Sequence, residues 1–513
     1  MKRQLGLIAL ALTCLSGCTD PSDFLSSRPL EFSCASYGDY RKIDESFLFP
    51  ELRQYAFPPS QSSSRQTALE ARLQRRTSAL PESLKTSLQV QIANLGSDNQ
   101  AMEPKPLRVL LLSGGGQWGA FGAGFLAELD SSDEAIEWDL VTGISTGAMQ
   151  AMFVGAGDYE GLREVYDIDT QSVYASKNGL VGLVRGGSQY DTRELRKAVM
   201  ERLLGTSGDI GLLASIKEGD GPSIRIGMVE ARTGDFYRVD LTKLIKENYS
   251  TVEADKLADC VAGIVMASSG VPAQLSPVQI DGITFSDGGV RESVFVADLA
   301  LDVELTYFLS TLAEESRQRG DGTELQTNGA DATKLPPPLF YVLRNGPTAL
   351  PDDDPSGRID DDPDLWQTAM RGYATLVNQN ELASITSVLL EYPRRPIKFV
   401  SADGYNWVRY WQGDTQGERG EALNCENLKR PTDQYFSPAF MQCLLLWGER
   451  HRSNTSQPSG WTDIANPNFC RHDRARRDDF GPVCDAEFAA ELRGNEAEIS
   501  DRLLHQFSKQ IEE

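Results

Sequence analysis

Two successive strand–turn–helix patterns constrain the fold of this 513-residue chain more than any other feature. Residues 107–112 form a nearly continuous apolar run that ends in a glycine-rich turn, and residues 117–129 then place apolar side chains at helical spacing. A second unit follows over residues 139–153, with a short strand, a tight turn at Ser145 and a helix. Consecutive units of this kind build parallel sheets that are covered on both faces. The sequence therefore predicts an α/β protein with a mostly parallel central sheet between helical layers.

Later segments continue the same pattern. Further strands are expected at residues 223–231, 303–310, 339–346 and 396–402. Residues 313–338 contain almost no apolar side chains, which is typical of a surface loop. The acidic segment 351–364 could bind calcium, but its prolines and irregular spacing favour a solvated loop, so we expect no metal site.

The charge of the chain argues against one class of partner. It has 74 acidic and 50 basic residues, which give a formal net charge of -24 at pH 7. A field of this sign repels a phosphate backbone, so we expect no nucleic-acid partner. The sequence gives no indication of an oligomeric state.

The glycines of the first turn fit two kinds of anion site. Gly114, Gly116 and Gly119 match the G-x-G-x-x-G spacing of dinucleotide-binding loops, whose backbone amides hold a pyrophosphate. In such proteins the second strand ends in an acidic residue that binds the ribose, whereas here Asp139 precedes that strand. A nucleotide-dependent oxidoreductase is therefore disfavoured, and no cofactor is expected.

The second turn has the pattern of a catalytic serine. Residues 143–147 read GISTG, a G-x-S-x-G motif between a predicted strand and a predicted helix. This context is typical of a nucleophile elbow, in which a sharp turn exposes the serine and the helix N-terminus favours developing negative charge. Ser145 is therefore the candidate nucleophile, although a plain tight turn could have the same five residues.

A serine nucleophile needs a base, and the sequence leaves two options open. The chain has three histidines, which are His451, His472 and His505. A Ser-His-Asp esterase could use one of them. Alternatively, an apolar strand ends at Asp287, and the two glycines after it allow a tight turn toward the same sheet edge. An aspartate is a weak base at neutral pH, so it would have to contact the serine directly in a desolvated site.

Three motifs together resemble the patatin-like phospholipases. They are GGGQWG at residues 114–119, GISTG at residues 143–147 and DGG at residues 287–289. Similar segments at residues 266–278 and 435–451 extend the resemblance over roughly residues 107–451. The resemblance implies a three-layer patatin-like α/β/α fold and a lipid ester substrate.

The resemblance also implies roles for individual residues. It makes Ser145 the nucleophile and Asp287 the base, with the backbone amides around Gly114, Gly115 and Gly116 as the oxyanion hole. The remaining motif positions are Gly119, Gly143, Gly147, Gly288 and Gly289.

Two positions depart from the family pattern. Ser113 stands where Asp is usual, which matters little to backbone donors. Trp118 stands where Arg or Lys is common, which weakens the case for anionic phospholipids as substrates. The indole could instead line an entrance for acyl chains.

The N-terminus has the pattern of a bacterial lipoprotein. Two basic residues precede a short apolar run, and the sequence LSGC that ends at Cys18 resembles a lipobox, whose cysteine is acylated. Residues 1–17 are therefore expected to be a signal peptide, and Cys18 is expected to anchor the chain in a membrane. Thr19 favours the outer membrane of a Gram-negative cell envelope. The alternative is an ordinary secretory signal with an incidental cysteine.

Six further cysteines permit disulfides in an exported protein. Their clustering near the C-terminus favours the local pairs Cys425 with Cys443 and Cys470 with Cys484. Cys260 instead lies on the apolar stripe of a predicted helix, so we expect a buried free thiol there.

These patterns predict the organisation and the function of the chain. Residues 18–106 are expected to form a tether and an N-terminal helical region, residues 107–455 the patatin-like domain, and residues 456–513 a cysteine-containing C-terminal extension. The predicted function is that of a serine acyl hydrolase that cleaves fatty acyl esters of lipids at a membrane. The alternatives are an esterase with a Ser-His-Asp triad and a non-catalytic surface lipoprotein.

Overall fold

The structure is a computed structural model of the whole chain. It describes residues 29–37, 41–43, 107–133, 135–178, 188–205, 210–250, 252–296, 338–351, 365–391, 397–405, 409–411, 422–425, 428, 435–454 and 460–464. The chain divides into two compact units, of which the first comprises Met1–Ile43, Val109–Val296 and Phe340–Val483. The second unit is described only at residues 107–108 and 338–339.

A sheet of eleven strands is the middle layer of the described chain. Its main path is β1-β9-β10-β7-β4-β3-β11-β12-β15, and β8 and β2 continue from β7. The bounds along this path are β1 Leu30–Phe32, β9 Val278–Ile280, β10 Ile283–Asp287, β7 Ser223–Glu230, β4 Leu140–Gly143, β3 Arg108–Leu112, β11 Leu339–Arg344, β12 Ile397–Ser401 and β15 Thr462–Asp463, with β8 at Phe236–Asp240 and β2 at Arg41–Ile43. The central strands β7, β4, β3, β11 and β12 run parallel, and β3 is buried from its second residue to its last.

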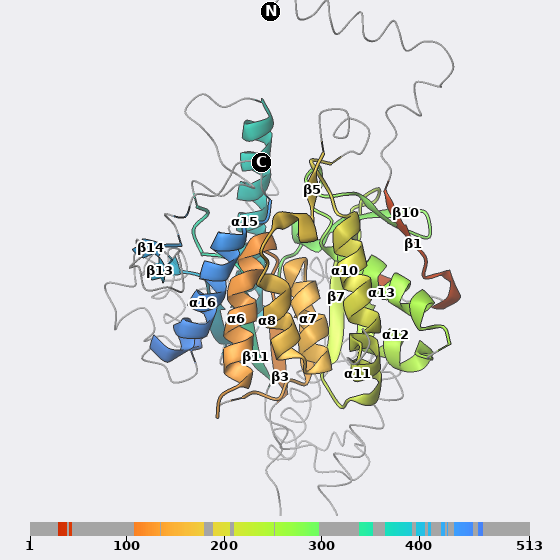
Figure 1. Cartoon of the computed structure of the whole chain (residues 1–513), viewed down its shortest axis with the longest axis horizontal. Coiled ribbons are helices and arrows are strands. Elements are labelled where there is room, and N and C mark those ends of the chain that lie inside the picture. The colour runs from red at the N-terminus through yellow and green to blue at the C-terminus, as the bar shows by residue number, and fades with distance from the viewer. Residues whose placement is uncertain are drawn as a thin grey trace, which may run out of the picture. The chain divides into compact units, whose positions relative to one another are not determined.

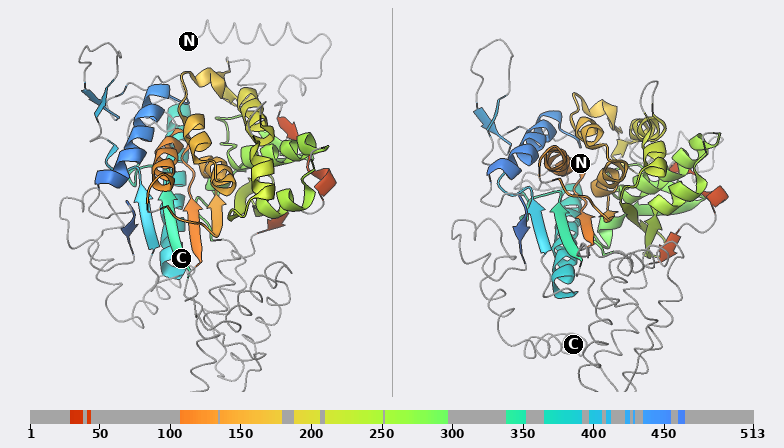
Figure 2. Two further views of the ribbon diagram at one scale, coloured as in Figure 1. Left: turned by 60° about the horizontal axis from the view of Figure 1, so that its bottom comes forward. Right: turned by 90° about the horizontal axis from the view of Figure 1, so that it is seen from below.

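Helices cover both faces of this sheet, which confirms the predicted three-layer α/β/α fold. Figure 2 shows α6, α7, α8 and α16 on one face and α15 on the other. The helix bounds are α6 Gly119–Asp130, α7 Thr146–Ala156, α8 Tyr159–Tyr166, α10 Arg193–Leu204, α11 Leu212–Glu218, α12 Leu241–Asn248, α13 Ala254–Ser268, α15 Leu365–Glu391 and α16 Pro438–Asn454. Helices α6 and α16 pack side by side (Figure 1).

The predicted strands are confirmed where the structure describes them. β3, β4, β7, β11 and β12 occupy the expected segments, and a short 3-10 helix at Gly116–Trp118 precedes α6. The expected strand at 303–310, most of the loop at 313–338 and nearly all of the acidic segment 351–364 lie outside the described residues. The sequence did not indicate β1 and β2, which extend the sheet with residues from before position 107.

Two disulfides connect the described cysteines. The Cys425–Cys443 bond confirms one predicted pair. The prediction of a free thiol at Cys260 is wrong, because Cys260 on α13 is bonded to Cys34, just after β1. The helix pattern correctly indicated a buried side chain, but β1 reaches α13 only because it pairs with β9 beside that helix. Cys470 and Cys484 lie outside the described residues.

Two kinds of feature are absent from the described residues of the chain. None of its helices combines the length and the apolar character that crossing a bilayer requires. Within the same residues, no group of three or more His, Cys, Asp or Glu side chains could hold a metal ion.

Candidate active site

The register of β7 brings the serine turn and the aspartate turn together. Gly143, the last residue of β4, pairs with Ile226, and Asp287, the last residue of β10, pairs with Met228. Ile226 and Met228 also pair with β8, so β4 and β10 must share the other edge of β7. β4 and β10 therefore lie on the same side of β7, and their last residues pair with β7 residues that are two positions apart.

Ser145 occupies the sharp turn between β4 and α7. Its φ is 55°, a left-handed backbone conformation that is uncommon for residues other than glycine. A β-carbon at Gly143 would lie 2.3 Å from the backbone oxygen of Gly147, and one at Gly147 would lie 2.5 Å from that of Leu112. The two motif glycines are therefore required because the turn packs backbone against backbone. This geometry is that of the predicted elbow.

Asp287 is buried and faces Ser145. Its carboxylate accepts hydrogen bonds from the Ser145 hydroxyl and from the backbone N–H of Gly289, the latter at 2.7 Å. Burial raises the pKa of Asp287 to about 6, although both hydrogen bonds act in the opposite direction. The carboxylate therefore has the proton affinity that a base needs near neutral pH.

The glycine-rich turn lies beside the serine. A β-carbon at Gly114 would come within 3.3 Å of the Ser145 β-carbon. Gly115 and Gly116 have φ values of 150° and 56°, which L side chains rarely adopt. Among the described residues, none accepts a hydrogen bond from the amides of these three glycines. These N–H groups are therefore available to a negatively charged oxygen next to Ser145.

A buried polar network that the sequence did not reveal supports this turn. Ser113 Oγ donates to the Gly114 carbonyl at 2.8 Å and accepts from the Asn345 backbone N–H at 2.9 Å. The Asn345 side chain donates to the Ser113 carbonyl and to Gln150 Oε1, each at 2.8 Å. Gln150 in turn donates to the Gly119 carbonyl at 2.8 Å. The serine in place of the family's usual Asp thus holds the turn through its hydroxyl.

Ser268 supports the serine turn in a similar way. At the C-terminal end of α13, its hydroxyl donates to the Gly227 carbonyl at 2.6 Å and accepts from the Ser145 backbone N–H at 3.0 Å. It therefore connects β7 to the residue that carries the candidate nucleophile. In the sequence, the signal that could have indicated Ser268 is its place within residues 266–278, the segment that resembles the family.

Trp118 is a core residue and not a surface side chain of the turn. It is 5% exposed, and its ring packs edge-on against Tyr405 and Phe440 with centroid distances of 4.9 Å. It contributes to the wall of the smaller of two cavities described next, but not to the apolar one. The place of the indole at an entrance for acyl chains stays a prediction.

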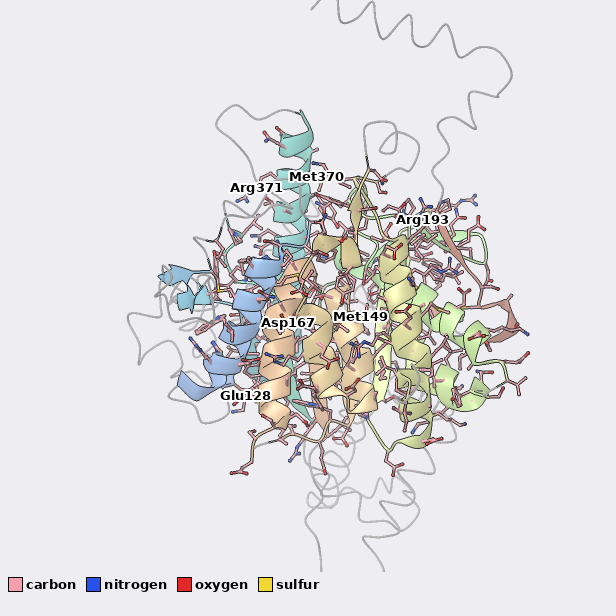
Figure 3. All side chains as sticks on the ribbon, in the orientation of Figure 1. Glu128, Met149, Asp167, Arg193, Met370 and Arg371 are labelled. Carbon is pink, nitrogen blue, oxygen red and sulfur yellow. A yellow bond between two sulfur atoms is a disulfide. The ribbon has the colours of Figure 1, made fainter. Side chains whose placement is uncertain are left out.

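Two cavities meet at the serine. The smaller has a volume of about 140 Å³ and is lined by the glycine turn, Asp287 and part of α15. The larger has a volume of about 570 Å³ and is lined mainly by apolar and aromatic side chains, including Met149 of α7 (Figure 3). Ser145, Gly116 and Tyr435 belong to both linings. A substrate with two unlike parts could therefore place one part on each side of the serine.

The histidine alternative gains no support. His451 lies on α16, packs against the rings of Phe121 and Phe125, and is absent from the linings of both cavities. His472 and His505 lie outside the described residues. Asp287 is therefore the base candidate that the described chain brings to Ser145.

Comparison of the sequence with known protein families gives one match. The sequence model of the patatin-like phospholipases matches residues 110–300, so this part of the chain is a patatin-like phospholipase domain. The predicted resemblance is thereby confirmed for these residues. No curated protein matches the sequence significantly. Among solved structures, the crystal structure of VipD from Legionella pneumophila is 10% identical, with coverage of 78% of this chain and 80% of that chain and a TM-score of 0.26.

Proposed function

We propose that this chain is a serine acyl hydrolase that cleaves fatty acyl esters of lipids, with Ser145 as nucleophile and Asp287 as base. One observation carries the proposal. A serine in a strained strand-to-helix turn donates its hydroxyl hydrogen to a buried carboxylate, and burial raises the pKa of that carboxylate to about 6. The match of residues 110–300 to the patatin-like phospholipases supports the reaction class.

The proposed reaction has two stages. Ser145 Oγ attacks the ester carbonyl carbon while Asp287 takes the hydroxyl proton, and the amides of Gly114, Gly115 and Gly116 stabilise the oxyanion. The C–O bond to the alcohol then breaks, and the alcohol leaves with the proton from Asp287. In the second stage Asp287 takes a proton from water, whose oxygen attacks the acyl-enzyme. The fatty acid leaves, and Ser145 recovers its proton from Asp287.

The larger cavity supports a fatty acyl group as the acid part of the ester. Its walls come from α7, α8, α10 and the start of α16, with side chains such as Met152, Phe153, Val199 and Met441. Contact between these side chains and an acyl chain removes apolar surface from water at roughly 25 cal/mol per Å². The walls thereby favour long acyl chains over acetyl esters.

We also propose that Cys18, which lies outside the described residues, anchors the protein in the outer membrane. Leu30 pairs with Val278, Val278 pairs with Phe285, and Phe285 pairs with Glu230 at the end of β7. β1 therefore begins at the sheet edge where the serine turn lies. The twelve residues from Cys18 to Leu30 reach at most about 40 Å. An anchor there would keep this edge close to the bilayer.

Two measurements test the anchor. Mass spectrometry of the N-terminal peptide should find an acylated Cys18, and Cys18→Ser should move the protein from the membrane fraction to the soluble fraction. An unmodified cysteine in the membrane-bound protein would disprove the lipoprotein assignment.

Hydrolysis assays test the activity itself. Purified wild type, Ser145→Ala and Asp287→Asn are compared on a panel of phospholipids and simple acyl esters of increasing chain length. Ser250→Ala and Asp220→Asn, at exposed positions, are the matched controls. We expect both site variants to lose turnover while the controls keep it. Turnover that survives Ser145→Ala would end the serine hydrolase proposal.

A further inference from the structure

The smaller cavity contains a buried ion pair that the proposed mechanism does not use. Arg344, the last residue of β11, is 1% exposed, and Glu381 of α15 is 7% exposed. Arg344 Nε lies 3.3 Å from Glu381 Oε2, and Arg344 Nη2 donates to Asn378 Oδ1 at 2.6 Å. Both charged residues belong to the lining that also includes Ser145 and Asp287.

Each member of this pair leaves a buried atom unsatisfied. Within the described chain, Arg344 Nη1 and Glu381 Oε1 have no hydrogen-bond partner. Buried polar atoms nearly always have partners, because an unpaired buried donor or acceptor is costly. Arg344 Nε also makes no hydrogen bond, although it lies within ion-pair distance of Glu381. The two residues that line the cavity wall thus keep unused donor capacity on Arg344 and unused acceptor capacity on Glu381.

The pair is held close to the catalytic turns. Arg344 immediately precedes Asn345, whose carbonyl oxygen lies so close to the glycine turn that a β-carbon at Gly115 would come within 1.8 Å of it. Glu381 immediately follows Asn380, whose side-chain amide donates to the Gly289 carbonyl at 3.1 Å. The backbone segments that carry Arg344 and Glu381 are thus held beside the glycine turn and the aspartate turn respectively.

The charges that line the smaller cavity determine which chemical group can bind there. Glu381 offsets Arg344, and the carboxylate of Asp287 adds negative charge in the same cavity. A phosphate would approach two carboxylates there and would be repelled. A hydroxyl, by contrast, accepts one hydrogen bond and donates another, which matches the unused Arg344 donor and the unused Glu381 acceptor.

We propose that the smaller cavity receives the leaving alcohol and that Arg344 and Glu381 select an alcohol with a second, free hydroxyl. The favoured substrate is then an acyl ester of a glycerol-like polyol, with its fatty chain in the larger cavity. This inference rests on the proposed hydrolase activity, since it assigns the alcohol side of the same ester. It gives the two residues a role in specificity, and the chemistry remains with Ser145 and Asp287.

Matched substrates test the inference on the wild-type protein. Monooctanoylglycerol and propyl octanoate share the acyl group and differ in the free hydroxyls of the alcohol. Both are assayed as dissolved monomers, so that binding to an interface does not contribute. We expect kcat/KM to be about tenfold or more higher for the glycerol ester. Octanoyl glycerol phosphate should be a poorer substrate than monooctanoylglycerol.

Variants of Arg344 and Glu381 test whether these two residues cause the preference for the glycerol ester. Arg344→Met combined with Glu381→Met removes both charges, so neither is left buried without its partner. We expect the ratio of the two kcat/KM values to fall toward one in this double variant. Leu376→Ala, at an exposed position of α15, is the matched control and should keep the wild-type ratio.

The outcomes separate this inference from the proposed function. Equal turnover of the two esters by wild type, a preference for the phosphate ester, or a preference that survives in the double variant would each overturn the inference and leave the hydrolase intact. If wild type hydrolyses neither ester but turns over other members of the acyl ester panel, the inference alone is overturned. If it hydrolyses none of the panel, the hydrolase is refuted and the inference with it.

Discussion

Replacing Asp287 by asparagine should abolish turnover and yet make the folded protein more stable at neutral pH. The carboxylate is 4% exposed, and its burial raises its pKa from 3.8 to about 6. Asparagine has nearly the same shape, and its side-chain oxygen can still accept the hydrogen bond from Gly289. The substitution therefore removes the buried charge and leaves the turn in place.

The pH dependence of this effect follows from the raised pKa. Well below pH 3.8 the carboxyl group of Asp287 is protonated in both the folded and the unfolded chain, so it contributes no penalty. Between pH 3.8 and about 6 the unfolded chain ionises while the folded chain stays protonated, so the free energy of unfolding falls, and above about pH 6 the penalty is constant. A rise in pKa from 3.8 to about 6 corresponds to about 3 kcal/mol at pH 7.

Denaturant unfolding at a series of pH values measures this difference. We expect Asp287→Asn to match wild type near pH 3 and to exceed it by about 3 kcal/mol above about pH 6. In parallel, kcat/KM of the wild type should rise to a plateau above about pH 6, where the base is ionised. A variant that is less stable than wild type at pH 7, or a wild-type activity that peaks below pH 5, would refute the reasoning.

Three further predictions concern the framework of the site. Gly115→Ala should abolish turnover, because its β-carbon would lie 1.8 Å from a backbone oxygen of the segment after β11; an active variant in the hydrolysis assay would contradict this. Cys34→Ala combined with Cys260→Ala should lower the free energy of unfolding by about 2 to 5 kcal/mol in denaturant unfolding, and an unchanged value would contradict this. Ser268→Ala should lower kcat more than it raises KM, because it frees the Ser145 amide; steady-state kinetics that show only a KM effect would exclude this role.

Several features of the site were predictable because they depend on local backbone geometry. A glycine on each side of Ser145 is readable as a sharp strand-to-helix turn, since only a residue without a β-carbon fits there. The same holds for the glycine turn after β3. The nearly continuous apolar run of residues 107–112 made β3 recognisable as a strand that is covered on both faces.

Other features depend on segments that are far apart in the chain. Asn345 and Gln150 look like ordinary polar residues, and only the packing of β11 against β3 brings them under the glycine turn. Cys260 was placed correctly in the core, but its partner Cys34 became visible only through the pairing of β1 with β9. Short-range patterns contain no information on such pairings.

The sequence by itself determined the turns, the central strands and the identity of the candidate nucleophile, because steric limits on a few neighbouring residues fix each of them. The tertiary structure decided which candidate base lies beside that serine. β7 pairs with both β4 and β10 along one edge, so its register sets Asp287 beside Ser145. Burial among the packed layers then raises the pKa of this aspartate. This shift depends on groups from several segments of the chain, so the sequence around Asp287 does not predict it.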